Sequence, residues 1–444
     1  MTPSAQIAAS IELLAAMEEA PRKPADAIAH HFFKERRYIG SSDRRNISTL
    51  VWHVLRHWYK LTWWLEKQSL THQEHTQHTQ QQGLKVIPRL LVGAWLLFDG
   101  LRLQEVITLY QEGRFSAGSL TQREINALVA LEGQSLMSSA MSRAVTLEVP
   151  EWLLPALEES FGPDTECELA ALSVPAPLDV RVNILRKTRE EACVALAREG
   201  IYAKKTVLSP WGLRLKERTL ITSTTPFREG IIEIQDEGSQ LVAAITGVTP
   251  GMRVLDYCAG AGGKTLAMAM MMHNKGHIVA CDVSAPRLEG AVKRLRRAGV
   301  HNVERHLLLE GDKWAKRRLA SFDCVLVDAP CSGIGTWRRN PDARVRLTRT
   351  DLEELVIQQA TILERAAAFV RPGGRLVYAT CSILQKENAD QIKAFLKHHT
   401  GFKSVPSLSP FVPDILRQKE EMTLTPARHG TDGFFAVVME RLES

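Results

Sequence analysis

The chain has 444 residues, of which 45% are hydrophobic and 24% are charged. At about 150 residues per domain this length predicts two or three domains, each large enough to bury its own core. The composition excludes wholesale disorder and fibrous repeats. The formal net charge of +6 permits an anionic partner such as nucleic acid but does not require one.

Membrane, secreted and metal-scaffold classes are also disfavoured. The apolar run at 90–98 is much shorter than the ~18 residues that cross a bilayer, so we expect no transmembrane helix. The N-terminus lacks the basic and apolar pattern of a secretory signal, which predicts a cytoplasmic protein. Seven cysteines, an odd number without a C-x-x-C pair, indicate free thiols rather than disulfides or a zinc site.

Residues 1–145 predict an all-helical domain. Apolar residues recur at helical spacing, for example Ile47, Val51, Val54 and Leu55. The expected helices cover 7–19, 24–37, 45–68, 87–110 and 122–139.

A polar segment at 72–82, rich in His and Gln, separates the third and fourth of these helices. Its composition favours a solvated loop. The alternative is a metal site of His72, His75 and His78, but only Glu74 is near enough to join them, so we assign no metal.

Residues 146–242 predict a small α/β subdomain that connects the larger parts. Strands are expected at 178–185, 212–215 and 231–233, with a helix at 189–199. From 243 to 444, short apolar runs alternate with helical segments, which indicates a mostly parallel, Rossmann-like sheet covered on both faces. The expected strands are 252–255, 277–281, 303–308, 324–327 and 375–378, and the helices are 265–272, 286–298, 350–369 and 386–399.

The carboxyl ends of parallel strands bind ligands, and the first strand here ends in a glycine loop. The segment 256–265 reads Asp-Tyr-Cys-Ala-Gly-Ala-Gly-Gly-Lys-Thr. Its glycines permit positive φ and close approach of a nucleoside-like ligand, whose polar groups Asp256 could receive. A phosphate-binding Walker loop would need glycine at Cys258, and a dinucleotide fingerprint would need glycine at Thr265.

Two more carboxylates follow the next strands. Asp282 lies 22 residues after Gly260, close to the offset at which an acidic residue binds a ribose diol. Asp312 follows the third strand and could accept an adenine amino group. Any one such aspartate could instead be a helix cap, but three at successive strand ends favour a ligand site.

The fourth and fifth strands lead into two cysteine turns, Asp328-Ala-Pro-Cys331-Ser-Gly and Ala-Thr-Cys381-Ser. In turns these thiols need not face the core, whereas Cys281 and Cys324 lie in apolar strands and are expected to be buried. A thiolate that adds to carbon 6 of cytosine makes carbon 5 nucleophilic toward a methyl donor. A second thiol or a nearby base could then assist release. The residues alone do not say which cysteine attacks.

With these segments the chain resembles S-adenosylmethionine-dependent RNA cytosine-5 methyltransferases, above all the bacterial small-subunit rRNA enzymes with a NusB-like N-terminal domain. The resemblance also includes Thr431-Asp-Gly-Phe-Phe. It implies that Cys381 is the nucleophile, that Cys331 assists release and that Asp328 contacts both cofactor and base. It further implies that S-adenosylmethionine is held by Cys258, Ala259, Gly260, Ala261, Gly262, Gly263, Lys264, Asp282, Asp312 and Asp328.

We therefore expect a monomer that forms 5-methylcytosine in RNA, above all rRNA, with tRNA or a non-catalytic ribosome assembly role as alternatives. An arginine-rich segment after the first cysteine turn could guide the target base by charge and stacking. It comprises Trp337, Arg338, Arg339, Arg344, Arg346 and Arg349. Its alternative is a salt-bridged surface loop. The basic residues Lys293, Arg294, Arg296 and Arg297 are interpreted as a solvated helix face.

Overall fold

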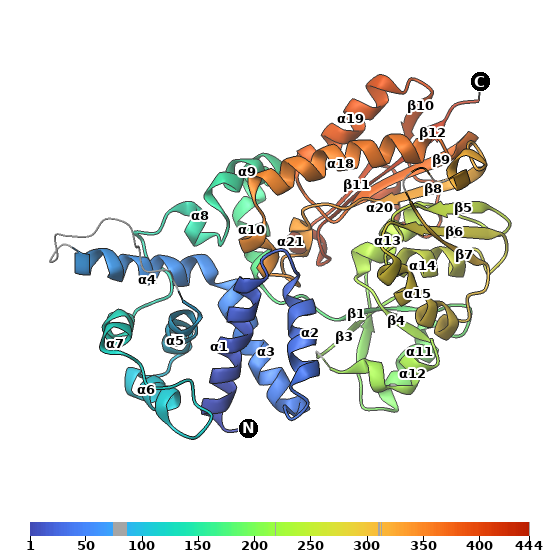
Figure 1. Cartoon of the computed structure of the whole chain (residues 1–444). Helices are drawn as coiled ribbons and strands as arrows, with labels where there is room; N and C mark the ends of the chain where they lie inside the picture. Colours follow the sequence, from blue (N-terminus) through green and yellow to red (C-terminus); the bar gives the residue numbers. More distant parts are fainter. Residues whose placement is uncertain (74–86, 218, 310, 312, 444) are drawn as a thin grey trace. The chain divides into compact units, whose positions relative to one another are not determined.

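The computed structural model describes residues 1–73, 87–217, 219–309, 311 and 313–443, which group into two compact units (Figure 1). The helical unit comprises Met1–Glu158, Thr165–Ser173 and Arg339–Thr348, and the larger unit holds the remaining residues. Asp312 and residues 74–82 of the His-rich segment lie outside the described part of the chain.

The helical unit is built around one apolar core that includes Leu13, Val51, Leu91 and Leu128. Among the described residues before 146, every regular element is a helix, as predicted. The helices of this region are α1 (Pro3–Glu19), α2 (Ala25–Glu35), α3 (Ser41–Arg56), α4 (Trp58–Gln73), α5 (Pro88–Phe98), α6 (Leu103–Gln111), α7 (Gln122–Val129), α8 (Arg143–Thr146), α9 (Leu154–Phe161), α10 (Thr165–Ser173) and α17 (Asp342–Arg346).

Two predicted helices are each divided in the structure. The predicted helix 45–68 is interrupted at His57, which caps α3 with non-helical backbone angles. The predicted helix 87–110 is interrupted between α5 and α6, where Gly100 has a φ of +106° that ends helical geometry. Apolar periodicity continues across both breaks, so it does not reveal them.

In the larger unit, a four-stranded antiparallel sheet has the order β2-β3-β1-β4. Its elements are β1 (Asp179–Val182), α11 (Arg189–Ala197), β2 (Ala203–Lys205), β3 (Gly212–Leu215), α12 (Thr225–Arg228) and β4 (Ile232–Ile234). Val180, Leu196, Leu213 and Ile232 share its core. This small sheet is joined to the next part of the unit by Asn183, whose amide donates to the carbonyls of Gly230 at 3.1 Å and Ala298 at 2.9 Å.

The second sheet is eight-stranded and mostly parallel, as predicted, with the order β10-β12-β9-β8-β5-β6-β7 and β11 paired to β12. Its strands are β5 (Arg253–Asp256), β6 (His277–Asp282), β7 (Val303–Leu307), β8 (Phe322–Asp328), β9 (Val370–Thr380), β10 (Phe402–Val405), β11 (Glu421–Leu424) and β12 (Phe434–Arg441). The five predicted strands are the parallel ones, whereas β10, β11 and β12 are antiparallel additions.

Helices cover both faces of this sheet because alternate strand residues enter two separate cores. Val254 and Leu326 pack with α13 and α14, whereas Leu255 and Val327 pack with α18 and α19. The helices of this part are α13 (Glu237–Ile245), α14 (Gly263–Met271), α15 (Ala285–Ala298), α16 (Lys313–Lys316), α18 (Arg349–Ala367), α19 (Ala389–His398), α20 (Asp414–Arg417) and α21 (Pro426–His429). A helix with the length and apolarity to span a bilayer is absent from the described residues.

The turn after β8 meets the start of β12 at a close backbone contact between two glycines. The amide of Gly335 donates to the Cys381 carbonyl at 3.0 Å, and the amide of Gly433 donates to the Gly335 carbonyl at 2.8 Å. A Cβ atom on Gly335 would lie 2.2 Å from the Gly433 carbonyl oxygen. Only glycine therefore fits at this contact.

We expect Gly335→Ala to lower the free energy of unfolding by about 1–3 kcal/mol, because backbone atoms must move to admit the methyl group. Urea denaturation measures the change. Gly401→Ala is the control, since a Cβ there meets nothing within 4 Å. Equal stabilities for the two variants would contradict the assigned contact.

Candidate active site

The glycine loop between β5 and α14 is held open by two left-handed residues. Gly260 has φ +55° and Gly262 has φ +78°, and Gly262 directly precedes α14. A Cβ on Gly262 would lie 3.2 Å from the Ala291 side chain, whereas a Cβ on Gly260 would meet nothing within 4 Å. The packed side of the loop is therefore at Gly262, and open space adjoins Gly260.

Asp282, at the end of β6, joins the second strand to this loop. Its Oδ2 accepts a hydrogen bond from the Gly260 amide at 2.8 Å, and its Oδ1 accepts one from the Ser284 amide at 2.8 Å. Each carboxylate oxygen has a further lone pair available to a ligand hydroxyl. The structure thus brings together Gly260 and Asp282, two of the predicted cofactor residues.

Lys264 and Asp328 form an ion pair between the loop and the end of β8. The Lys264 Nζ lies 2.6 Å from Asp328 Oδ2. Burial lowers the pKa of Lys264, but the Asp328 carboxylate and the nearby Cys381 sulfur raise it above the ordinary value. Lys264 also lies 5.6 Å from the ring centroid of Phe434, the first Phe of the Asp-Gly-Phe-Phe motif.

The two cysteine turns converge at this ion pair. The Sγ atoms of Cys331 and Cys381 lie 3.3 Å apart, and both residues are half-buried. The hydrogen bond with Cys381, together with burial, raises the pKa of the Cys331 thiol well above the usual range. By contrast, Cys281 and Cys324 are fully buried in their strands, as predicted, and all seven cysteines are free thiols.

A buried carboxylate that the sequence did not reveal ties the two turns together. Glu387 Oε1 accepts hydrogen bonds from the Ser332 amide at 2.8 Å and from Gln359 Nε2 at 2.9 Å. Its Oε2 accepts from the hydroxyls of Ser332 and Ser382, the residues that directly follow the two cysteines. Each cysteine turn is therefore anchored to the same side chain.

The segment around Glu387 is itself fixed by further hydrogen bonds. Tyr378 donates its hydroxyl to the Glu387 carbonyl at 2.7 Å, and the amide group of Asn388 donates to the Ser382 carbonyl at 3.1 Å. The one signal in the sequence was the repeated Cys-Ser pair. That pair does not show which distant acceptor would join the two serines.

The prediction for the arginine-rich segment is wrong at three of its residues. Trp337 is fully buried, so its ring cannot stack on a base. Arg338 is buried and pairs with Asp432 at 2.5 Å and Asp236 at 3.4 Å. Arg344 is buried within the helical unit, where it donates to the Leu172 carbonyl at 3.1 Å. Burial keeps all three side chains from RNA, and carboxylate partners of Arg338 and carbonyl partners of Arg344 hold the two arginines in place.

The expectation that Asp256 receives polar groups of a ligand is also wrong. Its side chain is 1% exposed, and Oδ2 accepts a hydrogen bond from Thr265 at 2.6 Å. Burial raises the pKa of this carboxyl to about 7. Asp256 therefore belongs to the buried support of the loop.

A mostly parallel sheet with an antiparallel strand beside β9, a glycine loop after β5 and an acidic residue ending β6 define an S-adenosylmethionine-dependent methyltransferase. Open space beside Gly260 and the carboxylate of Asp282 suit a nucleoside cofactor.

Residues 245–440 match the family model described as 16S rRNA methyltransferase RsmB/F, and residues 149–222 match the ferredoxin-like domain of RsmF/B-like methyltransferases. The chain belongs to the RsmB/F family of 16S rRNA methyltransferases.

Curated relatives agree with this assignment. A probable ribosomal RNA small subunit methyltransferase B from a Synechocystis species is 34% identical over 299 residues, which span 66% of this chain and 66% of that protein. Ribosomal RNA small subunit methyltransferase B from Serratia proteamaculans is 28% identical over 413 residues, 89% of this chain and 90% of that one.

One solved structure resembles nearly the whole chain, and another resembles about two thirds of it. The crystal structure of PH0851 superposes with a TM-score of 0.76 at 27% identity and covers 99% of both chains. NSun6 from Pyrococcus horikoshii, solved with SFG, has a TM-score of 0.58 at 21% identity and covers 66% of this chain and 99% of that one. The NSun6 likeness supports the fold.

We expect the raised pKa of Asp256 to make stability depend on pH. Between about pH 4 and pH 7 the folded protein retains a proton that the unfolded chain has lost, so the free energy of unfolding falls as pH rises through this window. Asp256→Asn removes this contribution. Urea denaturation measures the free energy of unfolding of both proteins from pH 4 to pH 8. Over this range the value for the variant, relative to that for the unaltered protein, should rise by on the order of 3 kcal/mol. A difference that is constant with pH would contradict the assignment.

We expect Glu387→Gln to lower the free energy of unfolding by about 1–3 kcal/mol, since one acceptor oxygen becomes a donor that faces other donors. Glu353→Gln on the exposed side of α18 is the matched control and should change it by less than about 0.5 kcal/mol. Denaturant titration of both variants measures these effects. A Glu387 variant as stable as the control would show that the carboxylate does not hold the turns.

Proposed function

We propose that the protein methylates carbon 5 of a cytosine in 16S rRNA through a covalent adduct with Cys381. The observation that carries the proposal is the 3.3 Å contact between Cys331 and Cys381 beside the Lys264–Asp328 ion pair. Membership of the RsmB/F family supports the rRNA substrate. Because rRNA is made and assembled in the cytoplasm of bacteria, we also propose that the protein is cytoplasmic. We further propose that it acts as a monomer.

S-adenosylmethionine, when bound, supplies an electrophilic methyl group. The segment from Cys258 to Lys264 would hold it through backbone groups and the open side of Gly260. Asp282 would accept the ribose hydroxyls, and Asp312 stays a proposal for the adenine contact. Ala261 would contribute its backbone, and its carbonyl accepts a hydrogen bond from Arg294 at 2.7 Å.

The protein acts on the cytosine ring in two steps, attack by Cys381 and then removal of a proton. Cys381 Sγ bonds carbon 6, which moves the electron pair of the ring double bond to carbon 5, the methyl acceptor. A base then removes the carbon 5 proton, and the pair left behind expels the Cys381 thiolate from carbon 6. Lys264 interacts electrostatically with Cys381, so a cation adjoins the proposed nucleophile.

Asp328 would act when the cytosine binds, and Cys331 would act when the methylated base is released. The Asp328 side chain remains 30% exposed, and its carboxylate is suited to accept a hydrogen bond from the exocyclic amino group of cytosine. Cys331 lies 3.3 Å from Cys381, so its thiol can donate a hydrogen bond to the Cys381 thiolate as that sulfur leaves carbon 6.

We expect the two cysteine variants to fail differently. Cys381→Ala should abolish methyl transfer to 16S rRNA, because no sulfur can add to carbon 6. Cys331→Ala should accumulate a protein–RNA adduct that survives denaturing electrophoresis, because attack is spared and release is hindered. Cys167→Ala, an exposed thiol of the helical unit, is the control and should methylate normally.

Normal turnover by Cys331→Ala would refute its assigned role. An adduct formed by Cys381→Ala would show that the nucleophile is a different residue.

A further inference from the structure

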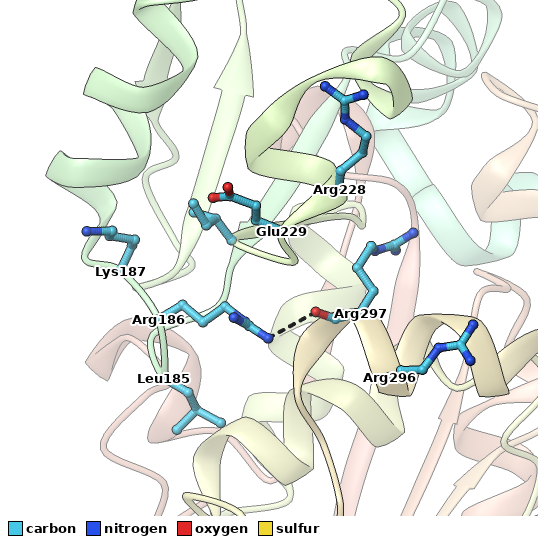
Figure 2. A pocket seen from close by; sticks show the side chains of 8 residues that line it. Leu185, Arg186, Lys187, Arg228, Glu229, Arg296 and Arg297 are labelled. Carbon is cyan, nitrogen blue, oxygen red and sulfur yellow. Dashed lines mark hydrogen bonds between the residues drawn. The ribbon is translucent and has the colours of Figure 1, made fainter.

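A basic depression outside the active site lies where the small sheet meets α15 (Figure 2). Its volume is about 600 Å³. Three segments line it: residues 185–187 after β1, residues 228–231 at the end of α12, and residues 296–297 in the last turn of α15. The lining side chains are Leu185, Arg186, Lys187, Arg228, Glu229, Ile231, Arg296 and Arg297.

Positive charge predominates here far more than in the chain as a whole. Five of the eight lining side chains are cationic and only Glu229 is acidic. Lys187 is paired with Glu191 at 3.4 Å, and Arg297 with Glu233 at 2.5 Å. Arg228 and Arg296 are exposed, and neither has an acidic partner among the described residues. Two cations are thus available to an anion.

Carbonyl groups at the C-terminal end of α15 would repel an anion, but two of them already accept hydrogen bonds from side chains. Arg186 donates to the Arg297 carbonyl at 3.2 Å, as Figure 2 shows, and Asn183 donates to the Ala298 carbonyl at 2.9 Å. These donors occupy carbonyls that carry the negative end of the helix dipole. The guanidinium of Arg297 lies 3.9 Å from the ring centroid of Phe227, which fixes it further.

The lining favours phosphate over nucleobase recognition. None of the eight side chains is aromatic, so no stacking platform for a base is present among them. Arginine guanidinium groups match phosphate oxygens and bind them in bidentate fashion. Since α15 has 14 residues, at about 1.5 Å each the depression is on the order of 20 Å from the Asp282 end of that helix.

We propose that this depression binds backbone phosphates of the RNA substrate at a distance from the target base. The proposal rests on the proposed function and adds a second contact that positions the RNA on the larger unit. It also changes the interpretation of Arg296 from a solvated helix residue to a phosphate ligand. Arg228 would contribute from the small sheet, so the two parts of the unit would bind one strand together.

The experiment compares Arg228→Gln/Arg296→Gln with the unaltered full chain. Filter binding of a 16S rRNA transcript, measured over a series of salt concentrations, gives Kd and its salt dependence. At low salt we expect Kd to rise about tenfold or more, and the slope of log K against log salt to fall by roughly 1.4–1.8, because two phosphate contacts are lost. Lys393→Gln/Lys397→Gln on exposed α19 removes the same charge and should leave the slope unchanged.

The possible outcomes separate this proposal from the proposed function. If the slope of log K against log salt is unchanged in the arginine variant while the unaltered protein methylates the same transcript normally, only the proposal that the depression binds phosphates is refuted. Lower affinity for assembled small subunits with unchanged affinity for free RNA would assign the surface to a ribosomal protein and overturn it too. A reduced slope in a protein that does not methylate the transcript supports the depression and refutes the proposed function.

Discussion

The contact between Cys331 and Cys381 depends on one buried carboxylate. Glu387 accepts hydrogen bonds from the serines that follow both cysteines, so two turns from neighbouring parallel strands are fixed to a common point. Parallel strands already place their carboxyl ends at one edge of the sheet. The Glu387 hydrogen bonds convert that general proximity into a 3.3 Å approach of two sulfur atoms. The rest of the site is arranged around this pair.

The order of strands and the residues at their ends could be predicted because their signals are local. Apolar runs bounded by turn residues marked β5, β6, β8 and β9, and each ended close to a functional candidate. Gly260 and Asp282, expected to bind one ligand from separate strands, are hydrogen bonded to each other. The antiparallel strands β10, β11 and β12 were not predicted. β10 and β11 each contain only two apolar residues, which is a weak signal, whereas the apolar run of the eight-residue strand β12 was assigned to no element.

The failed predictions concern contacts between residues far apart in the sequence. Arg338 resembles a surface residue until Asp432 and Asp236 are placed beside it. Asp256 resembles a ligand residue until the burial of its strand end is known. The role of Glu387 could not be predicted, because the two Cys-Ser turns come together only when β8 and β9 pair in the folded sheet. Composition and spacing do not contain this information.

The most direct measurement of the central claim is to identify the residue that bonds the base. A 16S rRNA transcript that contains 5-fluorocytidine prevents removal of the proton equivalent at carbon 5, so the adduct formed with S-adenosylmethionine persists. Mass spectrometry of the digested complex then locates the linkage. Our account predicts a linkage at Cys381. A linkage at Cys331, or a methylated RNA with no covalent linkage at any cysteine, would contradict it.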